Sequence, residues 1–240
     1  MQGVLHSVQH ALLIQPYTYT IMLTEQSLQF LYELSQNNNR DWFEKNKPRY
    51  EQVLKKPFEE TVDALIERMR AFEPQFEAKA KDCIFRLHRD TRFSKDKTPY
   101  KTNVSAVLTR HGRKSQHEPG YYLEIGFGAL NIGGGAYFLE KEDLHKVRTA
   151  IAQDPEAFHA VVEDADFVAH FEAIQGDKNK VMPPEFKEAA KTEPFLYNKQ
   201  FFFWKEMDSQ LALGTAFIDL AAEHFAAARG VNGYLRQALL

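Results

Sequence analysis

The hydrophobic pattern of this 240-residue chain changes its period near Cys83, and this change limits the folds that the chain can adopt. Before that point apolar residues recur at helical spacing, as in amphipathic helices. After it, four short runs alternate apolar and polar residues, as half-buried strands do; they cover residues 83–88, 104–108, 121–127 and 130–138. The connections between these runs are too short for crossover helices, so the strands are predicted to form an antiparallel meander.

Helices are predicted on both sides of the meander. Thr24 is expected to cap a first short helix, and Pro48 and Pro57 suit helix starts better than helix interiors. Further helices are expected over residues 140–153, 155–163 and 165–175. The predicted fold class is therefore α+β, an antiparallel sheet packed with N-terminal and C-terminal helices.

A further strand and a last helix are expected near the C-terminus. Residues 199–207 are aromatic enough for a strand, with one set of rings toward the core and the other beneath a helix. The last helix is predicted to run from about Asp208 to Arg229, with Gly230 as its C-terminal stop.

One domain is predicted for residues 22–240, because the chain shows no internal repeat, no low-complexity tract and no long Gly/Ser/Pro linker. Residues 1–21 lack the features of a signal peptide and are expected to form a flexible extension. The single cysteine, Cys83, excludes an intramolecular disulfide and is compatible with a reducing compartment, so a cytoplasmic location is expected. No apolar segment reaches the roughly 20 residues that cross a bilayer as a helix, so no membrane partner is expected.

Positive charge is concentrated in one segment of an otherwise acidic chain. The whole sequence carries a formal charge of −3, whereas residues 81–114 contain ten Lys or Arg and three Asp, a net charge of +7. Arginine presents a planar fork that matches phosphate and carboxylate groups, and lysine adds a mobile positive charge. A small phosphorylated or carboxylated ligand is therefore predicted to bind here. The candidate ligand-binding residues are Arg86, Arg89, Arg92, Lys97, Tyr100 and Lys101.

A reaction at this segment would need a group that titrates beside the bound charge, and Asp90 and His88 are the candidate catalytic residues. A structural role is the alternative, in which Asp90 and Asp96 neutralise their neighbours and tie down the connection over residues 91–101. Two further alternatives are a protein-interaction module and a nucleic-acid accessory protein that uses Trp42 or exposed aromatics for base stacking. The acidic remainder of the chain disfavours a long nucleic-acid track.

Other motifs give little support for a cofactor or a metal ion. The glycines at 133–135 are followed by no Gly-Lys-Ser/Thr, so a bulge or a close backbone approach is favoured over a phosphate-binding loop. The nine histidines are scattered, and His88 with Asp90 is the only local pair that could reach a metal. Neither a cofactor nor a metal site is predicted.

Several segments carry a resemblance to a known family: NNNRDWFEKNKPRY at 37–50, IFRLHRDTRFSKDKTPYKTN at 84–103, and GYYLEIG…GGGAYF…LHKVRTAI downstream. Together they resemble a widespread uncharacterised family of bacterial and fungal proteins that is catalogued as a domain of unknown function. The resemblance covers the chain from Met22 onward and implies one α+β domain without an established activity. It also implies that further residues belong with the charged segment, namely Arg40, Asp41, Trp42, Gly134, Gly135 and Arg148.

Overall fold

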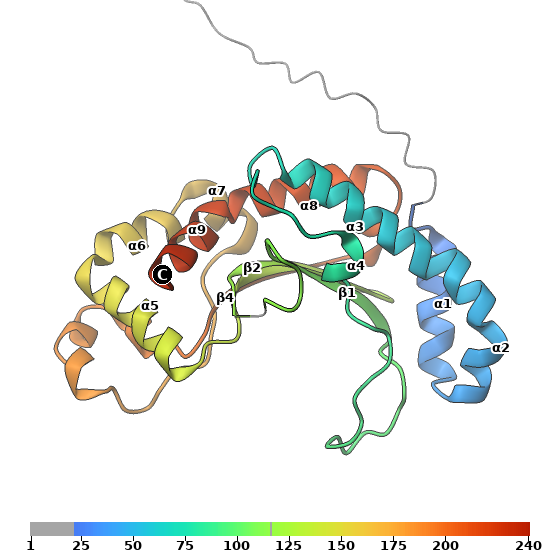
Figure 1. The fold of residues 1–240 in the computed structure, drawn as a ribbon, viewed down its shortest axis with the longest axis horizontal. Coiled ribbons are helices and arrows are strands. Elements are labelled where there is room, and N and C mark those ends of the chain that lie inside the picture. The colour runs from blue at the N-terminus through green and yellow to red at the C-terminus, as the bar shows by residue number, and fades with distance from the viewer. Residues whose placement is uncertain (1–21, 116) are drawn as a thin grey trace, which may run out of the picture.

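A four-stranded antiparallel sheet forms the centre of the molecule (Figure 1). The structure, a computed structural model, describes residues 22–115 and 117–240, and the extension expected at residues 1–21 lies outside the described residues. The strands follow the order β1 (Asn103–Leu108), β2 (Gly120–Gly126), β3 (Leu130–Ala136) and β4 (Phe201–Met207). These strands confirm the later three runs of the predicted meander and the C-terminal aromatic strand, and with the helices around them they confirm the α+β class.

Helices cover one face of this sheet. In β2 the side chains of Tyr121, Leu123 and Ile125 are buried, whereas the alternate residues Tyr122 and Glu124 are partly exposed. The helices that pack against the buried set, above the sheet in Figure 1, are α3 (Lys56–Met69), α8 (Ala216–Ala227) and α9 (Arg229–Ala238). Because successive strand residues point to opposite faces, the partly exposed set faces away from these helices.

The N-terminal helices stand at one end of the sheet in Figure 1. They comprise α1 (Glu25–Gln36), α2 (Arg40–Tyr50) and a π-helical turn, η1 (Glu51–Lys55), which leads directly into α3. Thr24 precedes α1 and Pro57 lies in the first turn of α3, both as predicted. The prediction that Pro48 begins a helix is wrong, because Pro48 lies inside α2. Neither proline has an N–H to donate, and the π-helical turn η1 connects α2 to α3 between them.

The strand predicted over residues 83–88 is also wrong. Cys83 instead ends a short helix, α4 (Ala80–Cys83), and its thiol is buried. Asp63 on α3 accepts a hydrogen bond from the backbone N–H of Ala80 at 3.1 Å and so supplies a partner to the first turn of α4. A contact with a distant helix therefore overrides the local alternation of apolar and polar residues.

The chain then leaves the sheet as an arm, defined as residues 84–102, which projects below the edge strand β1 in Figure 1. Two isolated bridges hold its base, one between Ile84 and Ala106 and one between His88 and Tyr100. The return segment contains Pro99, which has no N–H for a ladder, although its carbonyl accepts from the N–H of Arg89 at 2.9 Å. The arm is consequently an extended loop with local pairing and no regular strand.

Helices and short turns make up most of the C-terminal half. They are α5 (Lys141–Gln153), α6 (Pro155–Val162) and α7 (Ala165–Phe171), followed by the 3-10 turns η2 (Pro184–Phe186), η3 (Ala189–Lys191) and η4 (Pro194–Tyr197), and after β4 by η5 (Ser209–Ala212). The helices α5, α6 and α7 confirm the predictions for residues 140–153, 155–163 and 165–175.

The last predicted helix, residues 208–229, is confirmed by α8 over Ala216–Ala227, but its predicted start and its stop at Gly230 are wrong. The chain forms η5, turns at Gly214 with a φ of +73°, and continues as α8 and α9. Gly230 lies inside α9, where it is tolerated because Val231 and Leu235 are buried in the core. Asn232 on the same helix donates to the carbonyl of Gly120 at 3.1 Å, so tertiary contacts outweigh the low helix propensity of glycine.

The glycines of β3 confirm the predicted close backbone approach. A Cβ on Gly133 would lie 2.4 Å from the carbonyl oxygen of Phe203 in β4. A Cβ on Gly135, whose φ is +95°, would lie 2.3 Å from the carbonyl oxygen of Phe201. Both distances are too short for a real side chain, so β3 can approach β4 this closely only because these residues are glycines.

Candidate anion-binding site

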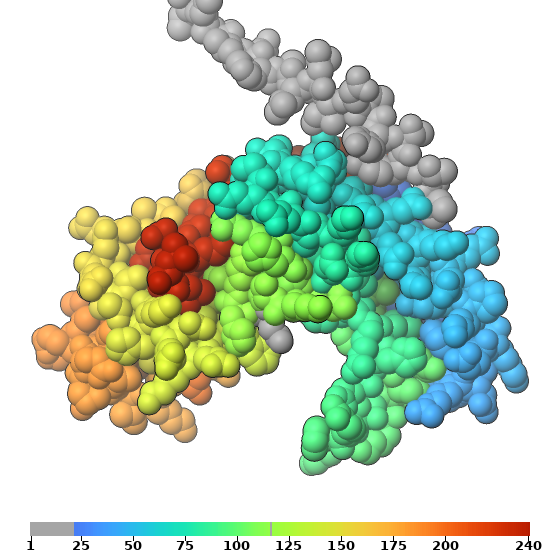
Figure 2. All heavy atoms as spheres, viewed as in Figure 1, coloured from blue at the N-terminus to red at the C-terminus, as the bar shows by residue number. Residues whose placement is uncertain are grey.

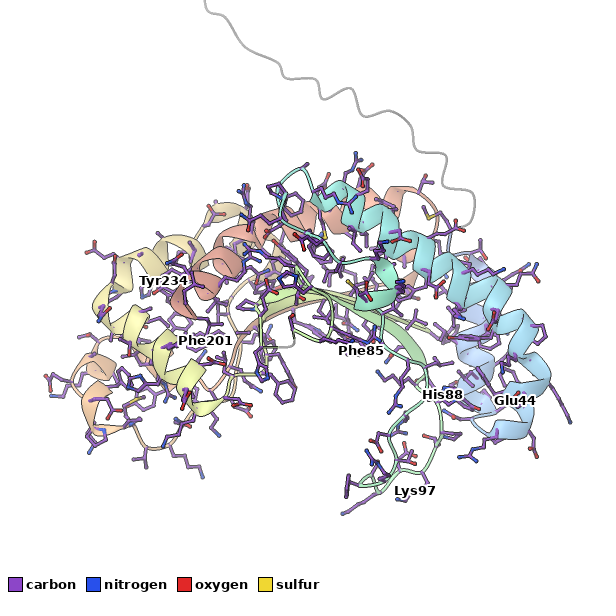
Figure 3. The ribbon with its side chains drawn as sticks, viewed as in Figure 1. Glu44, Phe85, His88, Lys97, Phe201 and Tyr234 are labelled. Carbon is purple, nitrogen blue, oxygen red and sulfur yellow. The ribbon has the colours of Figure 1, made fainter. Side chains whose placement is uncertain are left out.

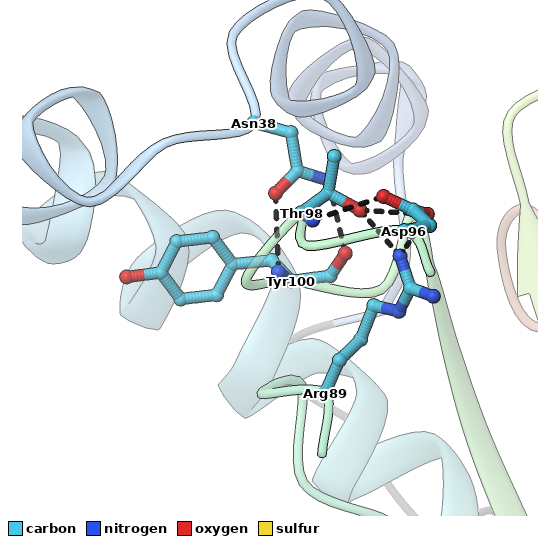
Figure 4. A network of polar contacts seen from close by, with 5 residues as sticks. All are labelled: Asn38, Arg89, Asp96, Thr98 and Tyr100. Carbon is cyan, nitrogen blue, oxygen red and sulfur yellow. Dashed lines mark hydrogen bonds and ion pairs between the residues drawn. The ribbon is translucent and has the colours of Figure 1, made fainter. Parts of the chain in front are cut away.

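The base of the arm is fastened to the turn between α1 and α2. The side-chain amide of Asn38 donates to the carbonyl of Tyr100 at 2.9 Å and accepts from the N–H of Tyr100 at 3.1 Å (Figure 4). Asn38 thus pairs with the backbone of the arm in the way that a neighbouring strand would. The contact joins residues that are 62 positions apart in the sequence.

Aromatic rings reinforce this attachment. The rings of Tyr100 and Phe43 on α2 are stacked with centroids 4.2 Å apart, and the His88 ring meets Tyr100 edge-on at 4.9 Å. The Tyr100 side chain is buried, while His88 lies at the base of the arm opposite α2, as Figure 3 shows. Both residues, predicted for ligand binding and catalysis respectively, are thus engaged in holding the arm against α2.

Asp90 and Arg92 form an ion pair on the arm. Arg92 Nε donates to Asp90 Oδ1 at 3.0 Å, and Arg92 Nη2 donates to Asp90 Oδ2 at 2.7 Å. These side-chain bonds, together with the backbone N–H of Arg92, lower the pKa of Asp90 to about 2. Asp90 is therefore a carboxylate at neutral pH and a weak proton acceptor.

Asp96 and Arg89 form a second ion pair (Figure 4). Asp96 accepts from the backbone N–H of Thr98 at 2.9 Å and from its hydroxyl at 3.0 Å. The backbone bond from Thr98, followed by the bond from Arg89, lowers the pKa of Asp96 to about 2. Lys97 donates to the carbonyl of Thr91 at 2.9 Å, so local partners engage this cation as well.

Four cations of the arm, Arg86, Lys95, Lys97 and Lys101, make no ion pair with any acid in the described parts of the chain. Arg86 and Lys101 line the same small pocket at the base of the arm, beside Lys55 of the π turn. Lys101 Nζ lies 5.0 Å from the centroid of the Phe85 ring. Burial lowers the pKa of Lys101, an effect that the negative charge of Glu124 opposes and the positive charge of Arg86 reinforces.

The residues added by family resemblance do not all lie near the arm. Arg40 begins α2 and is close enough for its charge to act on the Tyr100 hydroxyl, whereas the ring of Trp42 packs against Phe30 at 5.6 Å. Arg148 is buried in α5, at the other end of the sheet in Figure 1, where it donates to the carbonyl of Asn198 at 3.0 Å. Gly134 and Gly135 lie inside β3, and β2 separates them from the edge strand β1 that carries the arm. Asp41 is exposed on α2.

A group of side chains that was not predicted lies on the face of the sheet opposite the helices. We call this surface the open face; its residues are Ser105, Tyr122, Glu124, Asn131, Phe202, Trp204 and Glu206. The alternation within β2 and β4 marks these positions, but it does not reveal that no helix of residues 22–115 and 117–240 covers this face. The second set of rings in β4 was expected beneath a helix, and that prediction is wrong. Phe202 and Trp204 are partly exposed and contact Tyr137 and Tyr122.

The open face and the arm border one depression of the surface. Figure 2 shows a wide hollow between the arm and the start of α5, and the sheet in Figure 1 lies above this hollow. Phe85, at the base of the arm in Figure 3, connects the two surfaces, because its N–H is bonded to the carbonyl of Ser105 at 2.9 Å. The unpaired cations Arg86 and Lys101 thus lie at the edge of the open face.

A model of the conserved hypothetical protein family DUF2461 matches residues 26–234. The chain belongs to this family. No curated protein matches the sequence, and no solved structure matches the fold. Family membership confirms the resemblance and leaves the activity to be argued from the arm and the open face.

The described residues limit the chemistry of the site in two ways. Across residues 22–115 and 117–240, no group of three or more His, Cys, Asp or Glu side chains is placed so that it could hold a metal ion. No helix in these ranges is long and apolar enough to cross a membrane. The arrangement offers free cationic donors at the base of the arm and carboxylate and amide acceptors on the open face.

Proposed function

We propose that this protein binds a small phosphorylated or carboxylated ligand at the base of the arm, with Arg86 and Lys101 as the groups that receive the anion. The observation that carries this proposal is the division among the cations of the arm. Arg89 and Arg92 are paired with Asp96 and Asp90, whereas Arg86 and Lys101 line one pocket without an ion-pair partner among the described acids.

Desolvation supports Lys101 as one of these two residues. Burial disfavours the charged form of Lys101 and lowers its pKa, and the neighbouring positive charge of Arg86 lowers it further. A bound phosphate or carboxylate would place a negative charge beside both groups and favour the charged form of Lys101. Ligand binding therefore relieves an electrostatic cost that the folded protein carries at this position.

The ion pairs of the arm have a positioning role in this proposal. Asp90 with Arg92 and Asp96 with Arg89 shape the arm, and Asn38 fixes its base to the helices. Participation of Arg92, Lys97 or Arg40 in binding stays a prediction, as does proton transfer by His88. Arg148, which lies in α5, is not included in the proposed site.

The test is a thermal-stability screen with inorganic phosphate, sugar phosphates, nucleotides and dicarboxylates. A ligand at a hundred times its dissociation constant should add about 2.7 kcal/mol to the free energy of unfolding, which raises the melting temperature by several degrees. The variants Arg86→Gln and Lys101→Gln should lose this rise. The control Lys180→Gln should keep it, because Lys180 is exposed and remote from the arm in sequence. A rise that persists in both arm variants would exclude the proposed site.

A nucleic-acid accessory role is the second candidate, and one residue favours it. Phe93 is 95% exposed on the arm, with the guanidinium carbon of Arg92 5.8 Å from its ring centroid. An exposed ring among cations is typical of surfaces on which single-stranded bases stack. This role requires that a single-stranded oligonucleotide binds with steep salt dependence and that Phe93→Ala weakens the binding.

A further inference from the structure

The open face is organised in rows that run across the strands. Glu124 in β2 lies opposite Ser105 on one side and Asn131 on the other, and Asn131 lies opposite Glu206 of β4. In the adjacent row, Gly133 separates Tyr122 from Trp204. One row is therefore polar and the next is aromatic.

The aromatic row presents a stacked pair of rings on the open face. The rings of Tyr122 and Trp204 are nearly parallel, with an angle of 17° between their planes and centroids 5.9 Å apart. Gly133, which lies between them in the sheet, has no side chain to fill the space. Both rings are partly exposed, so a planar group can stack on them from the hollow below the sheet.

The polar row offers acceptors that need donors. Glu124 Oε2 accepts from the Tyr122 hydroxyl at 2.7 Å, and Glu124 Oε1 receives Asn131 Nδ2 at 3.4 Å. Asn131 is only 4% exposed, and its Oδ1 atom accepts no hydrogen bond from the described residues. Its neighbours Leu130 and Ile132 are in the core, so Asn131 belongs to the open face. A buried acceptor of this kind is stabilised by a ligand that carries an N–H or O–H group.

The cations at the base of the arm complete the pattern. The charge of Glu124 acts on Lys101, which places the polar row near the proposed anion site. Along the surface, the aromatic rings, the acceptors and the cations therefore follow one another in this order. A nucleoside monophosphate has the complementary order of a planar base, N–H and O–H donors and a phosphate.

We infer that the open face binds the nucleoside part of a free nucleotide, with the base on Tyr122 and Trp204 and the phosphate on Arg86 and Lys101. This inference rests on the proposed function, because it assigns a ligand class to the same anion site. A free nucleotide is favoured over a nucleic-acid strand because Glu124 and Glu206 on the open face would repel the successive phosphates of a polyanion.

The experiment is isothermal titration of the full chain with adenosine and uridine monophosphates, ribose 5-phosphate and inorganic phosphate. At least one nucleotide should bind at least tenfold more tightly than inorganic phosphate and ribose 5-phosphate. Trp204→Leu and Tyr122→Leu should each reduce this preference to less than threefold and leave phosphate binding unchanged. The control Phe127→Leu removes an exposed ring in the turn after β2 and should keep the preference.

Three results would overturn the inference. The first is that nucleotides bind no more tightly than inorganic phosphate. The second is that ribose 5-phosphate binds as tightly as the nucleotides, which would show that the sugar phosphate, and not the base, is recognised. A single-stranded oligonucleotide that binds tightly, with loss of affinity in Phe93→Ala and only weak binding of mononucleotides, would assign the surface to nucleic acid. A failure of the proposed anion site can be distinguished from a failure of this inference. If the anion site is wrong, Arg86→Gln leaves phosphate binding unchanged.

Discussion

Residues of the same chemical type have different environments along the arm. Arg92 is neutralised by Asp90, which lies two positions away, whereas Arg86 has no ion-pair partner among the described acids. The pair Asp90 and Arg92 is close in sequence and could be anticipated. The pair Arg89 and Asp96 spans seven positions and depends on how the arm folds back on itself. A count of charges in the sequence therefore overstates the number of cations that are free to bind a ligand.

Replacement of Arg92 by alanine should raise the pKa of Asp90 from about 2 toward 3.8, the ordinary value of an aspartate. The reason is that the side-chain hydrogen bonds from Arg92 are the largest cause of the lowered value. In the wild type, the pKa of Asp90 is lower in the folded than in the unfolded chain, so the ionised carboxylate stabilises the fold at pH values above the unfolded pKa. This stabilisation is lost as the pH falls through the folded pKa of about 2. NMR titration of the Asp90 carboxyl group measures the shift. Lys95→Ala is the control, and an unchanged pKa in Arg92→Ala would contradict the assignment.

At the scale of elements, the arm shows how distant partners replace a regular strand. Its base has two isolated bridges and a side chain, Asn38, that takes the place of a pairing strand. Pro99 and the contact of α4 with Asp63 prevent the alternation after Cys83 from extending into the sheet. The element that carries the candidate site is thus held by a few specific contacts.

Asn38→Ala should lower the free energy of unfolding by about 1–3 kcal/mol, because it leaves the part-buried N–H and carbonyl of Tyr100 without their partner. The variant should also weaken anion binding, since the arm is no longer fixed against the helices. Urea unfolding and ligand titration measure the two effects. Asn37→Ala is the matched control, because Asn37 is an exposed neighbour that bonds only to the Glu33 carbonyl through its side chain. Equal stability of the two variants would argue against the anchoring role.

At the scale of the whole molecule, one hydrophobic cluster extends from α1 to α9, and a buried polar contact joins distant parts of the chain. Glu73, just after α3, accepts from the Tyr121 hydroxyl at 2.8 Å and from Arg236 Nη2 of α9 at 2.5 Å. The side chains of Arg236 and Glu73 are only 14% and 7% exposed. This contact holds the helices on the covered face of the sheet and so leaves the opposite face open.

Arg236→Ala should destabilise the protein by about 3–5 kcal/mol, because it removes the cationic partner of a buried carboxylate. Arg68→Ala is the matched control and should cost at most about 1 kcal/mol, since its partner Asp219 is 58% exposed. Chemical denaturation of both variants measures the difference. Similar losses in the two variants would show that burial does not distinguish these ion pairs.

The periodicity of apolar residues was sufficient to predict the α+β class, the strands β1 to β3 and most of the helices, because side-chain spacing is a local property of the chain. The aromatic content of residues 199–207 predicted β4. The charged arm was also visible in the sequence as a concentration of Lys and Arg. Residue spacing did not predict the secondary structure where contacts between distant residues determine it. Examples are α4, which is bonded to Asp63, and α9, which contains Gly230. Only the tertiary structure decided which cations stay unpaired and which face of the sheet stays open. Both depend on residues far apart in sequence, such as Asn38 with Tyr100 and Glu73 with Arg236, which local patterns do not relate.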